Sequence, residues 1–379
     1  MEKFFATCPR GLEQLLAGEL QQLKAENIHA VGGGVGFSGL FPLCYLANLE
    51  SRMASRVLWR VAADRYRDED DIYRAAYALP WNDWFGPELT IRVDVTAIRC
   101  PLKSLNFVTL KIKDAVCDKI RRLSGRRPSV NTRQPDVPIQ GHLTDRDFTL
   151  YLDTTGDPLF KRGQRIAQGE APLRENLAAG VLRLAGWVPG TALLDPMCGS
   201  GTFLLEAAQI ALDIAPGLGR RFAFEKLKNF AARRWRGLLQ QSTARQKPGA
   251  PLSIYGSDLS GEALQSARAN LAAAGLKEVV SLKQANILEI SAPAKEGIIV
   301  TNPPYGVRLG EQQELAEFYP KLGDVLKKKF SGWRAYILSA DMRLPKLIRL
   351  AASKRTPLFN GPLECRLFEY KMVEGEMRR

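Results

Sequence analysis

Histidine and clustered cysteine are scarce in this sequence. Only two histidines occur, His29 and His142, and the six cysteines stand singly without any CxxC pair. Structural zinc sites and metal-hydrolase centres draw on clustered cysteine, histidine and carboxylate ligands, so this distribution argues against both. We therefore expect no bound metal and expect the cysteines to be reduced thiols, packed as small apolar side chains.

Long apolar runs are also missing. The N-terminal stretch MEKFFATCPRGLEQLL holds no hydrophobic segment of the length that a signal peptide needs. Residues 27–49 lack Asp, Glu, Lys and Arg, but several glycines and Pro42 interrupt them. A turn-rich soluble segment explains this stretch better than a membrane span. We expect a cytoplasmic protein.

Basic residues, in contrast, are abundant. The 379 residues are 45% hydrophobic and 25% charged, which is typical of a globular protein of two or three domains, and the formal net charge is +14. Residues 99–133, 216–249 and 321–355 each carry about ten basic residues and no more than two acidic ones. Any one such run can be a solvated face, but three together favour an extended anionic partner.

The hydrophobic pattern divides the chain into two differently organised parts. Residues 1–60 alternate a short strand (4–7), a helix (10–23), two extended pieces around glycine turns (29–39) and a further helix (40–58). Residues 61–160 add helices over 71–81 and 107–123 and strands over 90–98 and 147–154, with a Pro-rich loop over 124–138. Both segments suit small α/β structures.

The remainder repeats a strand followed by a helix or loop. Strands are expected over residues 191–195, 252–258, 279–285, 297–302 and 334–340. This alternation predicts an open, parallel, doubly wound sheet with helices on both faces, in which ligands bind beyond the carboxyl ends of the strands.

The segment LLDPMCGSGT (193–202) has the strongest chemical signature. It is a strand that ends in Asp195, followed by a small-residue turn and a helix. Gly199 and Gly201 lack a Cβ and let the backbone approach a ligand closely. Asp195 can attract a cation such as the ammonium group of an amino-acid cofactor. The turn has no lysine, so it does not fit a nucleotide-triphosphate loop.

Two further strand ends complete the pattern. Asp258 ends the strand IYGSD, where an acid can accept hydrogen bonds from two ribose hydroxyls. The strand IIVT runs into Asn302, Pro303, Pro304 and Tyr305. The prolines remove N–H donors and leave carbonyl oxygens, Asn302 offers an amide oxygen, and the tyrosine ring can stack on a base. Such a socket suits a planar amino group.

One motif misleads. Residues 34–39 match GxGxxG, the dinucleotide fingerprint, but no acid lies about 20 residues further on and Pro42 interrupts the following helix. Alternating Val31, Val35 and Phe37 indicate a hairpin instead.

DPMCGSGT followed by an Asp-ended strand and NPPY resembles the class I S-adenosylmethionine-dependent methyltransferases that act on amino groups. The resemblance implies that S-adenosylmethionine is the cofactor, that Asp258 holds its ribose, and that Asn302, Pro303, Pro304 and Tyr305 are catalytic. It assigns the remaining contacts of the motif to the cofactor as well: Asp195, Met197, Cys198, Gly199, Ser200 and Gly201. The family usually has an acid near the adenine amine, where this chain has Asn286, whose amide oxygen can accept in its place.

Other segments resemble the THUMP-domain methyltransferases that make N2-methylguanine in bacterial large-subunit ribosomal RNA. They are ATCPRGLEQLL, VGGGVGFSG, LKIKDAVCDKIRR and the stretch from Lys161 to Leu182. The resemblance implies a ferredoxin-like domain over residues 1–60, a THUMP RNA-binding domain over 61–160 and a Rossmann-like methyltransferase domain over 161–379, without a second methyltransferase half. It places Pro172 and Leu173 beside the cofactor.

The expected activity is transfer of a methyl group to the N2 amine of a guanine in 23S ribosomal RNA. A tRNA guanine-N2 methyltransferase, a protein glutamine methyltransferase and an RNA-binding assembly factor without catalysis are the alternatives. RNA contacts are expected from the basic THUMP helix, namely Lys111, Lys113, Lys119, Arg121, Arg122, Arg126 and Arg127. The basic stretch 216–249, with Trp235, is compatible with an RNA contact or with a solvated helical hairpin.

Overall fold

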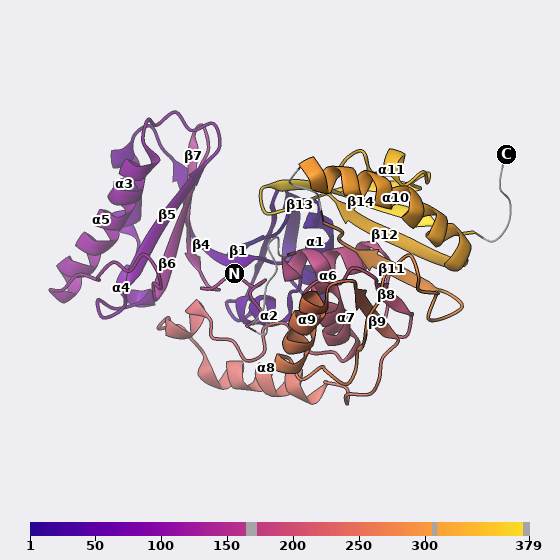
Figure 1. Ribbon diagram of the computed structural model, residues 1–379. Coiled ribbons are helices and arrows are strands. Elements are labelled where there is room, and N and C mark those ends of the chain that lie inside the picture. The colour runs from indigo at the N-terminus through magenta and orange to yellow at the C-terminus, as the bar shows by residue number, and fades with distance from the viewer. Residues whose placement is uncertain (164–172, 305–308, 374–379) are drawn as a thin grey trace. The chain divides into compact units, whose positions relative to one another are not determined.

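The computed structural model describes residues 1–163, 173–304 and 309–373, with the side chains of residues 309–314 left aside (Figure 1). The chain forms two compact units. Unit 1 contains Met1–Cys8, Leu16–Leu159 and Gly217–Gln241, and unit 2 contains Pro9–Leu15, Phe160–Pro216 and Ser242–Arg379. None of the described helices is both long and apolar enough to cross a membrane.

Unit 1 is built on one seven-stranded sheet in the order β2-β3-β1-β4-β7-β6-β5. Its neighbouring strands are antiparallel except for the parallel pair β5 and β6. The strands are β1 (Glu2–Thr7), β2 (Glu26–Val31), β3 (Gly34–Gly39), β4 (Arg56–Arg65), β5 (Ile91–Ala97), β6 (Val137–Leu143) and β7 (Asp147–Asp153). Because β4 continues past residue 60 in this shared sheet, the domain division at that residue stays a prediction.

Helices cover one face of this sheet. They are α1 (Glu13–Gln22), α2 (Leu43–Glu50), α3 (Glu69–Ala78), α4 (Trp81–Trp84) and α5 (Leu105–Ser124). The longest, α5, begins where the Ser104 side chain accepts a hydrogen bond from the Phe107 amide and ends at Gly125, whose φ of 73° is left-handed. Helical spacing predicts an apolar stripe of Leu110, Ile112, Val116, Ile120 and Leu123. Ile112, Val116 and Ile120 are fully buried, but Leu110 and Leu123 are exposed, so the buried face is narrower than expected.

Two expectations for this region are wrong. Residues 40–58 are not one helix, because α2 ends at Glu50 and β4 begins at Arg56. The β-rich run VLWRV pairs with β1 and β7 in the centre of the sheet, and this pairing outweighs the local helical pattern. The loop predicted over residues 124–138 is also too long by two residues, because β6 begins at Val137. The hairpin expected in place of a dinucleotide fingerprint is confirmed by the antiparallel pair β2 and β3.

Unit 2 contains a second seven-stranded sheet, in the order β10-β9-β8-β11-β12-β14-β13. The predicted strands form its parallel part: β8 (Leu193–Asp195), β9 (Ile254–Asp258), β10 (Ser281–Gln284), β11 (Gly297–Thr301) and β12 (Trp333–Ser339). The sheet is not wholly parallel, because β13 (Lys354–Asn360) and β14 (Leu363–Lys371) join as an antiparallel hairpin beside β12.

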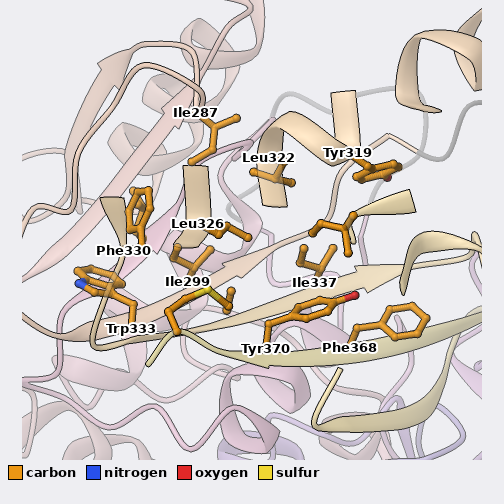
Figure 2. Close-up of a cluster of buried hydrophobic side chains, with 14 of the residues drawn as sticks. Ile287, Ile299, Tyr319, Leu322, Leu326, Phe330, Trp333, Ile337, Phe368 and Tyr370 are labelled. Carbon is orange, nitrogen blue, oxygen red and sulfur yellow. The ribbon is translucent and has the colours of Figure 1, made fainter. Parts of the chain in front are cut away.

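The helices and core of this unit hold the strand ends in place. The helices are α6 (Glu175–Leu184), α7 (Thr202–Ala211), α8 (Ala232–Ala244), α9 (Gly261–Ala273), α10 (Leu309–Lys329) and α11 (Leu344–Leu347), of which α8 lies largely in unit 1. Figure 2 shows Tyr319, Leu322 and Leu326 of α10 above Ile299 and Ile337 of the central strands. This packing holds β11 between β12, with which it pairs along its full length, and β8, with which it pairs at Ile298 and Ile299.

The basic stretch after α7 packs on unit 1. Phe224 lies 4.5 Å and Trp235 6.1 Å from the ring of Tyr45, measured between ring centroids. The hydroxyl oxygen of Tyr45 accepts a hydrogen bond from the Ala231 amide at 3.0 Å. Trp235 is only 5% exposed. The sequence left two alternatives for residues 216–249, an RNA contact or a solvated helical hairpin. The burial of Trp235 excludes the solvated hairpin for the aromatic residues of this stretch.

Candidate functional site

Asp195 ends the short strand β8 inside the protein. Its side chain is 2% exposed, and one carboxylate oxygen accepts from the Met197 amide at 3.3 Å. Burial raises the pKa of this carboxyl to about 7; the nearby Asp258 carboxylate adds to the shift, and Thr301 and the Met197 amide oppose it. A carboxylate held in this way gains most from a cationic partner, which would restore its charged form.

The turn after β8 depends on its glycines. Gly199 has φ +53° and Gly201 has φ +81°, both in the left-handed region that side chains with a Cβ rarely adopt. A Cβ on Gly201 would also lie 3.2 Å from the Cβ of Ala267 in α9. The turn closes with a hydrogen bond of 2.8 Å from the Gly201 amide to the Cys198 carbonyl. Glycine conformation and contacts within the protein therefore set the path of this turn.

Asp258 is tied to that turn. Its Oδ2 accepts a hydrogen bond from the Gly199 amide at 2.8 Å, and its Oδ1 accepts from the Ser260 amide at 2.9 Å. Ser260 in turn caps α9, since its hydroxyl accepts from the Ala263 amide. Each carboxylate oxygen keeps a further lone pair. A fixed, half-buried carboxylate of this kind can accept from two neighbouring hydroxyls.

Asn270, which the sequence did not indicate as a site residue, supports the turn after β8. Asn270 of α9 is fully buried, and its Nδ2 donates to the Ser200 carbonyl at 3.0 Å. The contact joins residues 70 positions apart, and a single asparagine in a helical pattern carries no local signal of it. In the turn itself, Met197 and Ser200 are half-buried, whereas Cys198 is buried, and burial raises the pKa of the Cys198 thiol. The thiol stays protonated and is a poor nucleophile.

The third strand end lies next to the first. β11 pairs in parallel with β8, with Ile299 opposite Leu194, so both chains leave the sheet at the same edge. Asn302 follows half-buried, Pro303 is buried and Pro304 is exposed. Tyr305 lies outside the described residues. The sheet thus brings Asp195, Asp258 and Asn302 to the carboxyl ends of three adjacent strands, β9, β8 and β11.

Three further residues, Asn286, Pro172 and Leu173, are predicted to contact the cofactor. The side-chain oxygen of Asn286 accepts from the Leu288 amide at 3.0 Å, which leaves one lone pair for another donor. Leu173 is buried just before α6. Pro172 lies outside the described residues. The contacts of these residues with a cofactor stay predictions.

The residues present fit S-adenosylmethionine by their chemistry. The buried Asp195 suits its ammonium group, the fixed Asp258 suits its ribose, and the turn at Gly199 and Gly201 offers backbone free of side chains. No three His, Cys, Asp or Glu side chains gather as metal ligands anywhere in the described part of the chain.

The predicted RNA-binding helix α5 carries its basic residues in two settings. Lys111 pairs with Asp70 at 2.6 Å, Lys113 with Asp114 at 2.8 Å, and Arg121 with Asp118 at 3.3 Å. Lys119 lies over the Tyr77 ring, and Arg122 donates to the hydroxyl of the same tyrosine. Arg126 and Arg127 are exposed beyond the end of the helix. Their binding to RNA stays a prediction.

A mostly parallel sheet with two acid-ended neighbouring strands and Asn-Pro-Pro after the third defines a class I S-adenosylmethionine-dependent methyltransferase. The methyltransferase domain described as RMKL-like matches residues 162–369, the THUMP domain matches residues 66–153, and the RlmL ferredoxin-like domain matches residues 3–58. The chain belongs to the THUMP-containing, RMKL-like family of S-adenosylmethionine-dependent methyltransferases. The predicted family, fold class and cofactor are thereby confirmed.

Individual relatives agree. A protein of Synechocystis sp., provisionally named an RNA methyltransferase, is 40% identical over 370 residues, which are 97% of this chain and 96% of that protein. The ribosomal RNA large subunit methyltransferase K/L of Aeromonas hydrophila is 39% identical over all of this chain, which spans only 55% of that protein. The crystal structure of SMU.472 complexed with SAH has a TM-score of 0.89 at 29% identity and covers 99% of both chains.

Proposed function

We propose that this chain transfers a methyl group from S-adenosylmethionine to the exocyclic N2 amine of a guanine in 23S ribosomal RNA. The observation that supports it most is the meeting of Asp195, Asp258 and Asn302 at adjacent strand ends in a chain that also carries a THUMP domain. The K/L relatives, named for the ribosomal large subunit, supply the choice of RNA. Such a substrate would place the protein in the cytoplasm.

The chain's own residues hold and orient the amine. We assign the Asn302 amide oxygen and the Pro303 carbonyl oxygen as acceptors for the two N2 hydrogens, because both follow β11 at the edge where Asp195 lies. S-adenosylmethionine, when bound, supplies an electrophilic methyl group on a sulfonium. A guanine in a helix cannot reach such a pocket, so the base must leave its stack. Tyr305 is proposed to stack on it.

In this proposal, catalysis comes mainly from positioning the guanine amine relative to the cofactor. Two acceptors fix the plane of the amino group and leave its nitrogen facing the cofactor side, and an oriented pair of reactants needs no covalent enzyme intermediate. The protonated Cys198 thiol fits that expectation.

The test is methyl transfer from labelled S-adenosylmethionine to unmodified 23S ribosomal RNA and, in parallel, to unmodified tRNA, with nucleoside mass spectrometry of the products. We expect N2-methylguanosine in 23S RNA only. Asn302→Ala should lower turnover by about 10²-fold or more while S-adenosylhomocysteine still binds, since positioning supplies much of the rate. Label in tRNA alone, or as N6-methyladenosine, would overturn the substrate or the base.

A further inference from the structure

The sheet of unit 1 has a second face, which the helices leave bare. In β7, Leu150 and Leu152 are fully buried on the helix side, so Tyr151 between them lies on the opposite side. In β1, the buried Phe4 and Ala6 likewise alternate with Lys3 and Phe5. The register connects these positions across the sheet. Phe5 pairs with Gly36 of β3, and Tyr151 pairs with Arg60 of β4.

A cavity of about 360 Å³ lies on this bare face. Its size falls in the range of pockets that hold a small organic group. Five adjacent strands line it, and the residues that carry its chemistry are Lys3, Phe5, Asn27, His29, Arg60 and Tyr151. We call it the sheet-face pocket. It lies wholly within unit 1, outside the strand ends of the methyltransferase sheet.

The glycines of β3 make room for two rings in this pocket. A Cβ on Gly36 would lie 2.1 Å from the His29 ring, and one on Gly34 would lie 2.5 Å from the Phe5 ring. Both rings therefore lie over the backbone of β3 where a side chain would exclude them. The GxGxxG spacing that does not bind a dinucleotide thus has a structural use: it lets aromatic side chains lie against the sheet.

The pocket combines aromatic rings with uncompensated positive charge. The Phe5 and Tyr151 rings are neighbours, with centroids 6.3 Å apart. No acidic residue lines the pocket, and within the described chain neither Lys3 nor Arg60 makes an ion pair. The nearest acid along the same face of β7, Asp153, is already paired with Arg56. On α5, by contrast, several basic side chains are partly neutralised by aspartates.

We propose that the sheet-face pocket binds single-stranded RNA, with one base stacked on Phe5 and Tyr151 and the flanking phosphates held by Lys3 and Arg60. Rings provide a sequence-tolerant surface for bases, and a cationic rim attracts phosphates. Bases in a duplex are already stacked and cannot lie flat on a sheet, so an unpaired segment is the fitting partner. This inference rests on the proposed function in taking RNA as the substrate, and it adds a substrate contact outside the methyltransferase site.

The test uses the full chain and a fluorescein-labelled uridylate 12-mer, with binding followed by anisotropy between 50 and 300 mM salt. Lys3→Gln combined with Arg60→Gln removes two charges without disturbing the core. We expect roughly tenfold weaker binding and a log–log salt slope smaller by about 1.4, because each lost phosphate contact on a single strand removes about 0.7. Phe5→Leu keeps an apolar side chain but loses the stacking ring, and should weaken binding about fivefold.

The matched control is Lys24→Gln combined with Arg99→Gln, a lysine and an arginine that, like Lys3 and Arg60, make no ion pair in the described part of the chain. It removes the same charge from the same unit, at exposed positions that do not line the pocket. It should bind the 12-mer as the unchanged chain does. Equal losses in both charge variants would overturn the proposal, as would unchanged binding in Phe5→Leu or a duplex that competes as well as the 12-mer.

A second measurement does not depend on variants. A 12-mer containing 5-iodouridine, irradiated on the protein, should form adducts that mass spectrometry maps to Phe5 or Tyr151. Adducts confined to other segments would overturn the proposal. A protein that crosslinks at Tyr151 but methylates no RNA would lose the proposed function and keep this inference. If methylation is normal but the pocket variants bind RNA as the unchanged chain does, the proposed function stands and this inference is overturned.

Discussion

The backbone amide of Gly199 donates a hydrogen bond of 2.8 Å to Oδ2 of Asp258. A second bond runs beside it, from the Cys198 amide to the Ser257 carbonyl at 2.9 Å. The glycine turn after β8 and the acid that ends β9 are therefore joined directly, although 59 residues separate them. A change in the turn should be felt at the acid, and this coupling makes the two glycines informative positions.

We expect Gly201→Ala to be more damaging than Gly199→Ala. Both glycines have positive φ, which costs a residue with a Cβ about 1–2 kcal/mol. Only at Gly201 does the added Cβ also meet a neighbour, Ala267, at 3.2 Å, whereas the space around Gly199 is open. Thermal unfolding should show a lower midpoint for Gly201→Ala than for Gly199→Ala. Equal midpoints would show that the contact with Ala267 has no energetic effect.

The raised pKa of Asp195 predicts a pH dependence of cofactor binding. Because burial places this pKa near 7, the carboxyl is mostly protonated at pH 6 and mostly charged at pH 8. Only the charged form attracts an ammonium group. The affinity for S-adenosylhomocysteine, measured by calorimetry, should therefore rise by up to about tenfold between pH 6 and pH 8.

The control for this prediction is Asp195→Asn, which keeps the shape and cannot titrate. Its affinity should be lower at pH 8 and nearly constant across the range. The same raised pKa means that the folded state binds a proton more tightly than the unfolded chain between about pH 4 and 7, so Asp195 alone makes folding less favourable as pH rises there. A pH dependence that survives in Asp195→Asn would assign the effect to another group.

For unit 2, the sequence predicts the residues at the strand ends better than it predicts the full set of strands. Asp195, Asp258 and Asn302 each follow a strongly apolar or β-rich run, and parallel strands necessarily bring such ends to one edge. The hairpin of β13 and β14 has no comparable signal. Pro357 interrupts the edge strand β13, and the charged residues Glu364, which is exposed, and Arg366, which is half-buried, alternate with buried residues in β14. Its strand character comes from pairing with β12, a contact absent from local sequence.

The placement of residues 217–241 was beyond prediction for the same reason. The stretch belongs to unit 1 through a contact between Ala231 and Tyr45, which are 186 residues apart. Periodicity could indicate a helix around Trp235, but it could not indicate which surface that helix covers. Long-range packing decides this, and only the three-dimensional structure contains it.

That packing leads to a prediction about stability. Trp235 is buried against Phe222, Phe224 and Tyr45, so Trp235→Ala should lower the free energy of unfolding by about 3–5 kcal/mol. Tyr45→Phe keeps the ring and removes only the hydroxyl that accepts from Ala231, and should cost about 1 kcal/mol. Urea unfolding followed by far-UV circular dichroism would measure the free energy of unfolding of both variants. Similar losses in the two variants would contradict ring packing as the main contribution.

In the proposed contact between the THUMP domain and RNA, the basic residues of α5 should contribute unequally. Lys111 and Arg121 face Asp70 and Asp118, whose charges cancel much of their field, and Lys111 lowers the pKa of Asp70. Arg126 and Arg127 are exposed and make no ion pair within the described residues.

Two double variants with the same change in net charge test this difference. Arg126→Gln with Arg127→Gln should weaken binding to a 23S ribosomal RNA fragment and reduce the log–log salt slope by about 1.4–1.8, the value for two phosphates. Lys111→Gln with Arg121→Gln should change the slope by less than half of that, because two aspartates are freed as two cations are removed. If both variants reduce the slope equally, the ion pairs open on binding, and all of these side chains reach phosphates.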